Sequence, residues 1–207
     1  AGELKSKYKK LDVLLNNAGA IFLNRQVSVD GYEMSLALNH LNYFLLTDLL
    51  LDMLKAQPQA RIVNVSSNAH YRGHINFDDL QCKRYNGMGR YSESKLMNVL
   101  FTYELARRLK GTNVTANCLH PGFVASNFAQ NNGFISKVVM PLIFWRISNE
   151  DGAKCSIYLA SSPEVQGLSG KYFHYNMKER RSTDESYDEN VAKRLWDVSE
   201  KLVAIGS

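Results

Sequence analysis

Tyr91 and Lys95 stand four residues apart in a segment that has the pattern of a long helix. Side chains with this spacing lie on one helical face, about one turn from each other. A phenol has an ordinary pKa of about 10, and a neighbouring ammonium favours the phenolate and lowers that pKa. The pair is therefore a candidate for proton transfer near neutral pH. The alternative, for the pair taken alone, is two solvated surface side chains.

Three apolar segments end in small or polar residues that could line a binding site. The first runs into Asn16-Asn17-Ala18-Gly19, the second ends at Ser66-Ser67, and the third ends at His120-Pro121-Gly122. Ligands of open parallel sheets bind at the carboxyl ends of the strands. We therefore expect these three strand ends to converge on one cleft.

Taken with Tyr91 and Lys95, these motifs resemble the short-chain dehydrogenase/reductase family. The chain has, in order, Asn-Asn-Ala-Gly, a helix with Asn39, Ser-Ser, Tyr-x-x-x-Lys and Pro-Gly, and this order covers nearly all of it. Five ordered motifs are much more specific than any one of them. Within the family the chain is most similar to the retinol-dehydrogenase-like branch, on segments 38–47, 75–80 and 119–122 and on the long stretch between Ser67 and Tyr91.

The resemblance implies a role for each motif residue. Tyr91 would exchange the proton with the substrate oxygen, and Lys95 would lower the pKa of Tyr91 and bind the nicotinamide ribose. Ser67 would hydrogen-bond the substrate oxygen, although Ser66 is a rival and both serines could simply end a strand. Asn39 would hold a water near the lysine through a main-chain carbonyl. The alternative for Asn39 is a helix amide that satisfies a buried backbone group.

The resemblance also implies a nicotinamide cofactor, NADP or NAD, with NADP favoured. Small residues such as Gly19 would let the cofactor approach the backbone closely. A hydroxyl at Ser126 would hold the carboxamide, unless Ser126 is an ordinary loop or cap residue. His40 is interpreted as structural, because Tyr91 would already act as the base. The implied cofactor-binding residues are Asn17, Ala18, Gly19, Tyr91, Lys95, Pro121, Gly122, Val124 and Ser126.

The family normally opens with a strand, a glycine-rich turn and a helix whose N-terminus receives the cofactor pyrophosphate. The sequence has no such run, and Gly87-Met88-Gly89 follows no strand. Residues 1–207 are therefore interpreted as a single domain, the C-terminal portion of an α/β, doubly wound, Rossmann-like parallel sheet. We expect either part of a longer protein or a truncated form, with the first strand edge bare.

Alternating apolar segments predict a parallel sheet with helices on its faces. Asp30 is the expected cap of the first helix. The predicted strands span residues 11–15, 61–66, 114–119 and 171–174, and the predicted helices span residues 28–56, 90–110, 151–161 and 188–203.

Two apolar surfaces are expected from the same segments. Since many relatives pack the long helices against a partner subunit, a homodimer would use exposed Val99, Phe101 and Tyr103. The stretch from Phe134 to Ile147 suits a lid over a lipophilic substrate, and Pro141 within it interrupts regular helix. A core helix, a dimer contact and a membrane-surface patch are the alternatives for that stretch.

The composition is that of an ordinary globular protein, with 45% hydrophobic and 22% charged residues. The net charge is +5, but lysines and arginines are scattered among acidic residues, so nucleic-acid binding is not favoured. Three widely spaced cysteines indicate neither a disulfide framework nor a metal site. No apolar run reaches the length of a membrane span. These features indicate an intracellular protein, cytoplasmic or associated with a membrane.

The sequence thus predicts an oxidoreductase that moves hydride between a nicotinamide cofactor and a small lipophilic carbonyl or alcohol, such as a retinoid or steroid. The alternative is a non-catalytic or truncated relative that serves binding or regulation, and the absent phosphate-binding turn motivates it. Intact Asn39, Ser67, Tyr91 and Lys95 argue against this alternative, because a chain released from catalysis has no need of all four.

Overall fold

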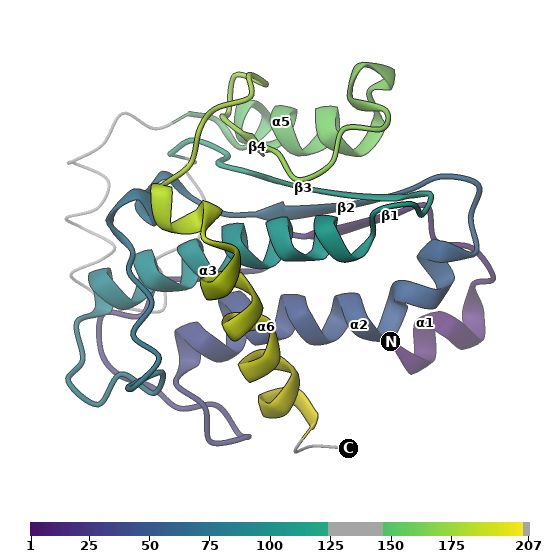
Figure 1. The fold of residues 1–207 in the computed structure, drawn as a ribbon. Helices are drawn as coiled ribbons and strands as arrows, with labels where there is room; N and C mark the ends of the chain where they lie inside the picture. The colour runs from purple at the N-terminus through teal and green to yellow at the C-terminus, as the bar shows by residue number, and fades with distance from the viewer. Residues whose placement is uncertain (124–146, 205–207) are drawn as a thin grey trace.

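The computed structural model describes residues 1–123 and 147–204. Its centre is a sheet of four parallel strands in the order β1-β2-β3-β4, which confirms the predicted parallel α/β architecture (Figure 1). Within the described residues β1 pairs with β2 alone, so its other edge is bare. The strands are β1 (Val13–Asn16), β2 (Ala60–Val65), β3 (Val114–Leu119) and β4 (Tyr172–Phe173).

Helices cover both faces of this sheet. Figure 1 shows α5 on one face and α2 and α3 on the other, with α6 lying across α3. The helices are α1 (Gly2–Lys7), α2 (Asn42–Lys55), α3 (Gly87–Arg108), α5 (Asn149–Ser161) and α6 (Glu189–Ala204). Shorter helical segments are the π-helix η1 (Leu36–Leu41) and the 3-10 helices η2 (Asn68–Arg72), η4 (Pro163–Val165) and η5 (Asp184–Tyr187).

The strands are buried on both faces because successive side chains point to opposite sides. On β2, Ile62 joins the core beneath α2 and α3, whereas its neighbour Val63 joins the core beneath α5. Phe101 of α3 and Leu159 of α5 belong to these two cores respectively. Each such buried side chain contributes roughly 1.5–3 kcal/mol, so the two cores fix where the strand ends lie.

Two helix starts differ from the sequence prediction. Residues 27–33 form a turn closed by a β-bridge between Val27 and Glu33, and Asp30 is exposed rather than capping a helix. The cap is Glu33, whose carboxylate accepts the main-chain N–H groups of Ser35 and Leu36 at 2.8 and 2.9 Å. Short polar side chains are the usual caps, so the pattern pointed to Asp30.

The helix with Tyr91 begins three residues earlier than predicted, at Gly87. The Asn86 side chain caps it by accepting the N–H of Gly89 at 3.1 Å. The glycine pair that matched no phosphate-binding pattern is therefore part of the first turn of α3.

The expected dimer surface on α3 is wrong. Val99, Phe101 and Tyr103 are only 0%, 3% and 5% exposed. Trp196 of α6 stacks on Phe101 at 5.8 Å between ring centroids, and the hydroxyl of Tyr103 lies 2.7 Å from that of Ser182. The chain covers this face with its own C-terminal region, so these side chains belong to the core of the subunit.

His40 links η1 to α6, as a structural histidine would. Its Nε2 lies 2.7 Å from the Ser199 hydroxyl, which donates to the carbonyl of Leu195 at 2.8 Å. Because that hydroxyl proton is already used, Nε2 of His40 carries the hydrogen and donates it. Burial, helped by the nearby Arg90 charge, lowers the pKa of His40 to about 3. His40 is therefore neutral at physiological pH.

The free energy of unfolding is expected to fall as the pH drops below about 6.5. In the unfolded chain His40 takes up a proton near its ordinary pKa of about 6.5, whereas in the folded protein its pKa is about 3. Between these two pH values the unfolded state binds more protons, so acid favours unfolding. Urea unfolding at neutral pH and near pH 5 should show a loss of roughly 2 kcal/mol from this residue. His40→Gln keeps a donor toward Ser199 and removes the titration, so it should reduce the pH dependence. An unchanged pH dependence in the Gln variant would contradict this assignment.

Candidate active site

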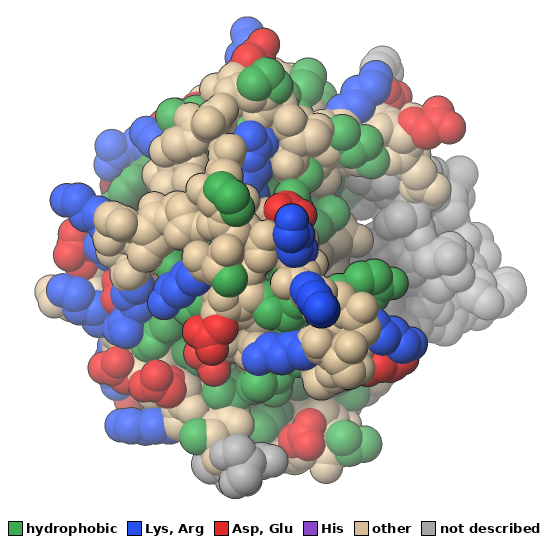
Figure 2. Space-filling view, turned by 90° about the vertical axis from the view of Figure 1, so that its right-hand side faces the viewer, with side chains coloured by type: hydrophobic (Ala, Val, Ile, Leu, Met, Phe, Trp, Pro, Cys, Tyr) green, Lys and Arg blue, Asp and Glu red, His purple; other side chains and the backbone are tan. Residues whose placement is uncertain are grey.

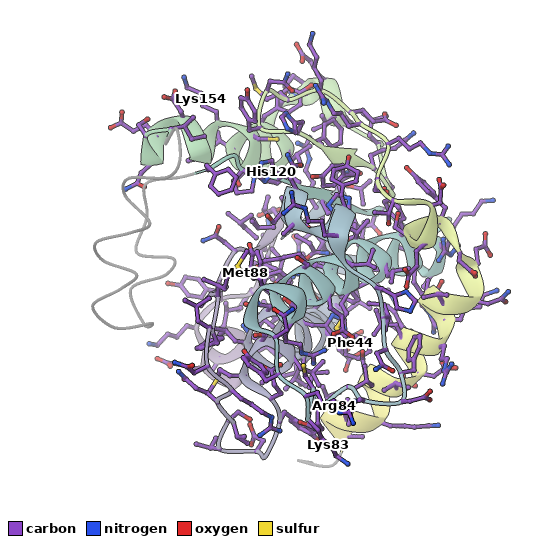
Figure 3. The ribbon with its side chains drawn as sticks, turned by 90° about the vertical axis from the view of Figure 1, so that its left-hand side faces the viewer. Phe44, Lys83, Arg84, Met88, His120 and Lys154 are labelled. Atoms are coloured by element: carbon purple, nitrogen blue, oxygen red, sulfur yellow. The ribbon has the colours of Figure 1, made fainter. Side chains whose placement is uncertain are left out.

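The carboxyl ends of the strands lie on the same side of the molecule as the start of α3, to the left in Figure 1. Figure 3 looks onto this side and shows His120 below α5 and Met88 at the beginning of α3. The parallel register places Asn16 beside Asn64 and Val65 beside Leu119, so the three strands end nearly level. The convergence expected from the sequence is therefore present in the described residues.

Lys95 is buried at the centre of this region. Its Nζ donates to the carbonyl of Val65 at 3.3 Å and lies 5.7 Å from the centroid of the Tyr91 ring. A Cβ atom on Gly19 would lie 3.1 Å from that Nζ, so a glycine lets the loop after β1 approach the lysine. Burial lowers the pKa of Lys95 to about 8. An ammonium with this pKa can release or regain its proton near neutral pH.

Tyr91 is buried on the same helical face, and its pKa moves in the opposite direction to the sequence expectation. Burial raises the pKa of Tyr91 to about 12, while a hydrogen bond with the Ser67 hydroxyl lowers it by less. The lowering expected from the Lys95 ammonium is not found. Desolvation of the phenolate sets the direction in which the pKa of Tyr91 moves.

The two adjacent serines have different surroundings. Ser66 is 2% exposed and donates its hydroxyl to the carbonyl of Lys95 at 2.7 Å. Ser67 is only half-buried, and its hydroxyl meets Tyr91 and accepts the N–H of Ala69 at 3.2 Å. Of the two rivals, Ser67 is the more exposed, whereas Ser66 holds α3 against β2.

Asn39 lies in the π-helix η1, and such segments frequently occur at functional sites. Its amide oxygen accepts the N–H of Ala20 at 2.9 Å, and its amide nitrogen donates to the Ala20 carbonyl and to the Ser94 hydroxyl. The side chain thus satisfies backbone groups, which was the alternative considered for it. Any contact with a relayed water would use the main-chain carbonyl of Asn39.

The residues at the end of β1 differ in their exposure. Asn16 donates to the Asn64 side chain at 2.8 Å and to the Thr47 hydroxyl at 3.0 Å, so it ties β1 to β2 and α2. Asn17 and Ala18 are exposed beside it. Because Asn16 already performs the structural task, Asn17 and Ala18 are available to a ligand.

Gly122 follows β3 at the same edge and has φ +88°, a conformation that favours glycine. A Cβ atom there would lie 2.5 Å from Cδ1 of Ile147. Both the backbone conformation and the space at this position therefore favour glycine. The remaining predicted residues, Val124 and Ser126, and the apolar stretch before Ile147 lie outside the described residues.

A buried ion network beside Tyr91 was not found from the sequence. The Arg90 side chain has 0% exposure and binds the carboxylates of Glu33 and Glu93, each at 2.7 Å, and the carbonyl of Leu80. Glu93 also accepts the N–H of Asn76 at 3.0 Å. Charged helix residues are usually solvated, so the sequence carried no signal for this burial. The network joins the cap of η1, the loop after η2 and the first turns of α3.

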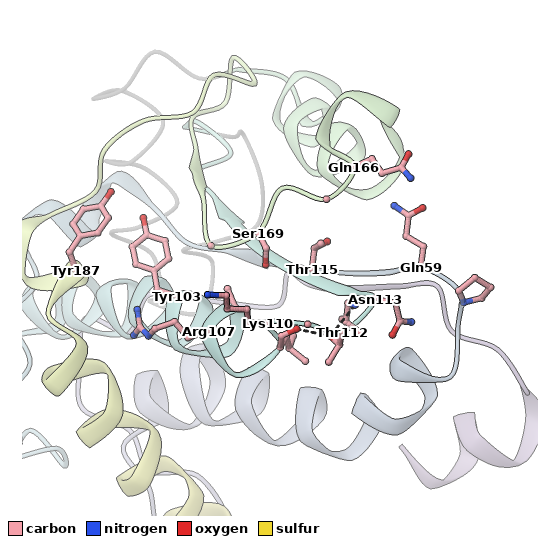
Figure 4. A pocket seen from close by; sticks show the side chains of 17 residues that line it. Gln59, Tyr103, Arg107, Lys110, Thr112, Asn113, Thr115, Gln166, Ser169 and Tyr187 are labelled. Atoms are coloured by element: carbon pink, nitrogen blue, oxygen red, sulfur yellow. Dashed lines mark hydrogen bonds between the residues drawn. The ribbon is translucent and has the colours of Figure 1, made fainter.

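A separate cavity lies at the other end of the sheet. It has a volume of about 630 Å³ and lies at the C-terminal end of α3 and the start of β3, where Tyr103, Lys110 and Thr115 line it (Figure 4). Sixteen residues of helix separate Tyr91 from Arg107, which corresponds to roughly 24 Å. None of the predicted site residues lines this cavity, so its size does not make it the candidate active site.

The described surface and side chains do not point to other ligand classes. On the face shown in Figure 2, positive and negative side chains are interspersed. Within residues 1–123 and 147–204, no group of three or more His, Cys, Asp or Glu residues could hold a metal ion. In that same part of the chain, no helix combines the length and apolar character that crossing a membrane requires.

Comparison with known proteins agrees with the sheet and its strand-end residues. The family model for short chain dehydrogenase matches residues 1–133, and the chain belongs to this family. Human retinol dehydrogenase 14 is 48% identical over 98% of the chain, and human retinol dehydrogenase 13 is 44% identical over 99% of it. The chain spans 62% and 64% of the lengths of these two relatives.

Among solved structures, an uncharacterized protein from Mycobacterium Paratuberculosis has a similar fold. Its TM-score is 0.75 at 33% sequence identity, and the match covers 97% of this chain and 69% of that protein. The structural match supports the assignment of the sheet and helices as part of a short-chain dehydrogenase fold.

Proposed function

We propose that the protein is a nicotinamide-dependent oxidoreductase that interconverts a lipophilic alcohol and its carbonyl compound. The observation that carries this proposal is the contact between the Ser67 hydroxyl and the buried phenol of Tyr91, with Lys95 one helical turn away. A hydroxyl and a phenol that converge in this way can bind one substrate oxygen between them. The names of the relatives support a retinol-like substrate for the full-length protein.

In the direction of carbonyl reduction, Ser67 would donate a hydrogen bond to the substrate oxygen. Tyr91 is protonated at neutral pH, since burial raises its pKa to about 12, and would deliver its proton to the same oxygen. Lys95, with a pKa lowered to about 8, would then return a proton to the phenolate. In alcohol oxidation the same groups would act in reverse order.

The cofactor, when bound, supplies or accepts the hydride. Gly19 and Gly122 lie beside the site and have no side chain there. Asn17 and Ala18, next to Gly19, are exposed. These residues, with Lys95 toward the ribose, would hold the nicotinamide half of NADP or NAD. We favour NADP, on the family resemblance alone.

Replacement of Lys95 with Ala in the full-length protein should lower the rate and weaken nicotinamide cofactor binding together. On this proposal the ammonium serves both the phenol and the ribose, so both functions should suffer. The measurement is cofactor affinity by calorimetry beside steady-state reduction of a retinoid aldehyde over a range of pH. If cofactor affinity and the pH profile were both unchanged, Lys95 would be a structural residue only.

Residues 1–207 expressed alone should bind NADP and NAD weakly. A pyrophosphate needs clustered N–H donors at a helix N-terminus, and the sequence contains no glycine-rich turn to supply them. Adding a strand, a glycine-rich turn and a helix upstream should restore binding and turnover. Micromolar or tighter binding by residues 1–207 in calorimetry would contradict this prediction and would reveal an unrecognised phosphate site.

A further inference from the structure

The backbone of Ser67 is held by one buried histidine, His70. The carbonyl of Ser67 accepts two hydrogen bonds from this residue, from the main-chain N–H at 3.0 Å and from ring Nδ1 at 2.6 Å. A carbonyl oxygen only accepts, so Nδ1 of His70 must carry the hydrogen. His70 is 0% exposed, and burial lowers its pKa below the ordinary value, so the ring stays neutral with a fixed tautomer.

The ring of His70 is itself fixed by aromatic side chains. Tyr71 lies 4.0 Å away and Tyr172 of β4 lies 4.7 Å away, measured between ring centroids. The hydroxyl of Tyr172 donates to the Asn68 side chain at 2.9 Å, which ties the same turn to the neighbouring strand. A donor held in this way cannot follow the Ser67 carbonyl if that carbonyl rotates.

The other side of Ser67 is anchored by the sheet and by α3. The N–H of Ser66 donates to the Leu119 carbonyl at 2.7 Å, and the Ser66 hydroxyl donates to the Lys95 carbonyl. Although Ser66 is fixed, the Ser67 carbonyl can still turn about the Cα–C bond of Ser67. The two hydrogen bonds from His70 to that carbonyl fix this rotation. The N–H of Ala69 then orients the Ser67 hydroxyl, which meets Tyr91.

We infer that His70 is a positioning residue for the reaction, which acts by fixing the Ser67 hydroxyl relative to the phenol of Tyr91. This inference rests on the proposed function. Small displacements of a reacting group can lower a rate by about a hundredfold, so the ring donor should matter to turnover although it touches no substrate.

The test compares variants of the full-length protein in reduction of a retinoid aldehyde by the nicotinamide cofactor. His70→Leu removes the ring donor and should lower kcat by roughly 10- to 100-fold, with cofactor affinity and KM nearly unchanged. His70→Asn places an amide N–H close to the position of Nδ1 and should recover most of the rate. His70→Gln has a similar size but carries its donor one bond further away, and it should remain slow.

A control separates positioning from general stability. Asn117 on β3 also donates from a buried side chain to a carbonyl, that of Leu168 at 2.7 Å, and this hydrogen bond involves none of Ser67, His70 and Tyr91. Asn117→Leu should lower the thermal stability and leave kcat nearly unchanged. Equal rates for the Asn and Gln variants of His70 would overturn the inference, and this comparison holds even if His70→Leu does not fold.

Failure of the inference is distinguishable from failure of the proposed function. If Ser67→Ala loses activity in the same assay while His70→Leu keeps it, the site stands and only the positioning role of His70 is refuted. If the wild type shows no cofactor-dependent reduction, the proposed function itself is wrong, and if Ser67→Ala and Tyr91→Phe both keep full activity, the proposed site is wrong; the inference falls in either case.

Discussion

Replacement of Tyr91 with Phe is expected to lower turnover by about a hundredfold to ten-thousandfold in the full-length protein. Phenylalanine keeps the ring that fills the space beside Lys95 and removes the phenol oxygen that would transfer the proton. Because the ring contacts remain, cofactor affinity should be nearly unchanged. Steady-state reduction of a retinoid aldehyde, with cofactor binding measured separately, gives both quantities.

Tyr103→Phe is the matched control for this prediction. Tyr103 lies on the same helix, is also buried, and has its hydroxyl 2.7 Å from that of Ser182, but it is three turns from the site. Its replacement should reduce stability and leave the rate nearly unchanged. Substantial activity in Tyr91→Phe would refute the assignment of Tyr91 as the proton-transfer group.

Replacement of Arg90 with Leu is expected to lower the free energy of unfolding by roughly 3–5 kcal/mol. The guanidinium neutralises Glu33 and Glu93, whose side chains are 0% and 11% exposed, and its removal leaves two carboxylates together without a counter-charge. Urea unfolding of the wild type and the variant measures the loss.

An exposed ion pair supplies the control for Arg90. Lys154 and Asp151 on α5 are 2.6 Å apart, but their side chains are 62% and 51% exposed, so Lys154→Met should leave the free energy of unfolding nearly unchanged. Figure 3 shows Lys154 on the outer side of α5. A change of similar size in both variants would mean that the Arg90 network does not stabilise the start of α3.

The parts of the fold that depend on local pattern could be predicted from the sequence. Apolar runs of strand length predicted all four strands, and the spacing of Tyr91 and Lys95 predicted a shared helical face. These features follow from periodicity, which a sequence displays directly. The order of the strand-end motifs also predicted the family, which the comparisons confirm.

The features that depend on tertiary burial could not be predicted. The Glu33 carboxylate binds main-chain N–H groups at the start of η1 and also pairs with Arg90, which lies 57 residues further along the chain. The pKa of Tyr91 rises because its surroundings exclude water, which neighbouring residues in the sequence do not reveal. Val99 and Phe101 were assigned to a surface because nothing in their own helix shows that Val99 packs with Cys118 and Tyr172 or that Trp196 of α6 stacks on Phe101.

The most direct test of the proposed function is the fate of a labelled hydride. The full-length protein would be supplied with a retinoid aldehyde and a reduced nicotinamide cofactor, NADPH or NADH, that carries deuterium at the transferable position. We predict that mass spectrometry will find the deuterium on the carbinol carbon of the alcohol product, and that Tyr91→Phe will greatly reduce its formation. Absence of cofactor-derived deuterium from the product, with both cofactors bound, would contradict the account and favour a non-catalytic binding role.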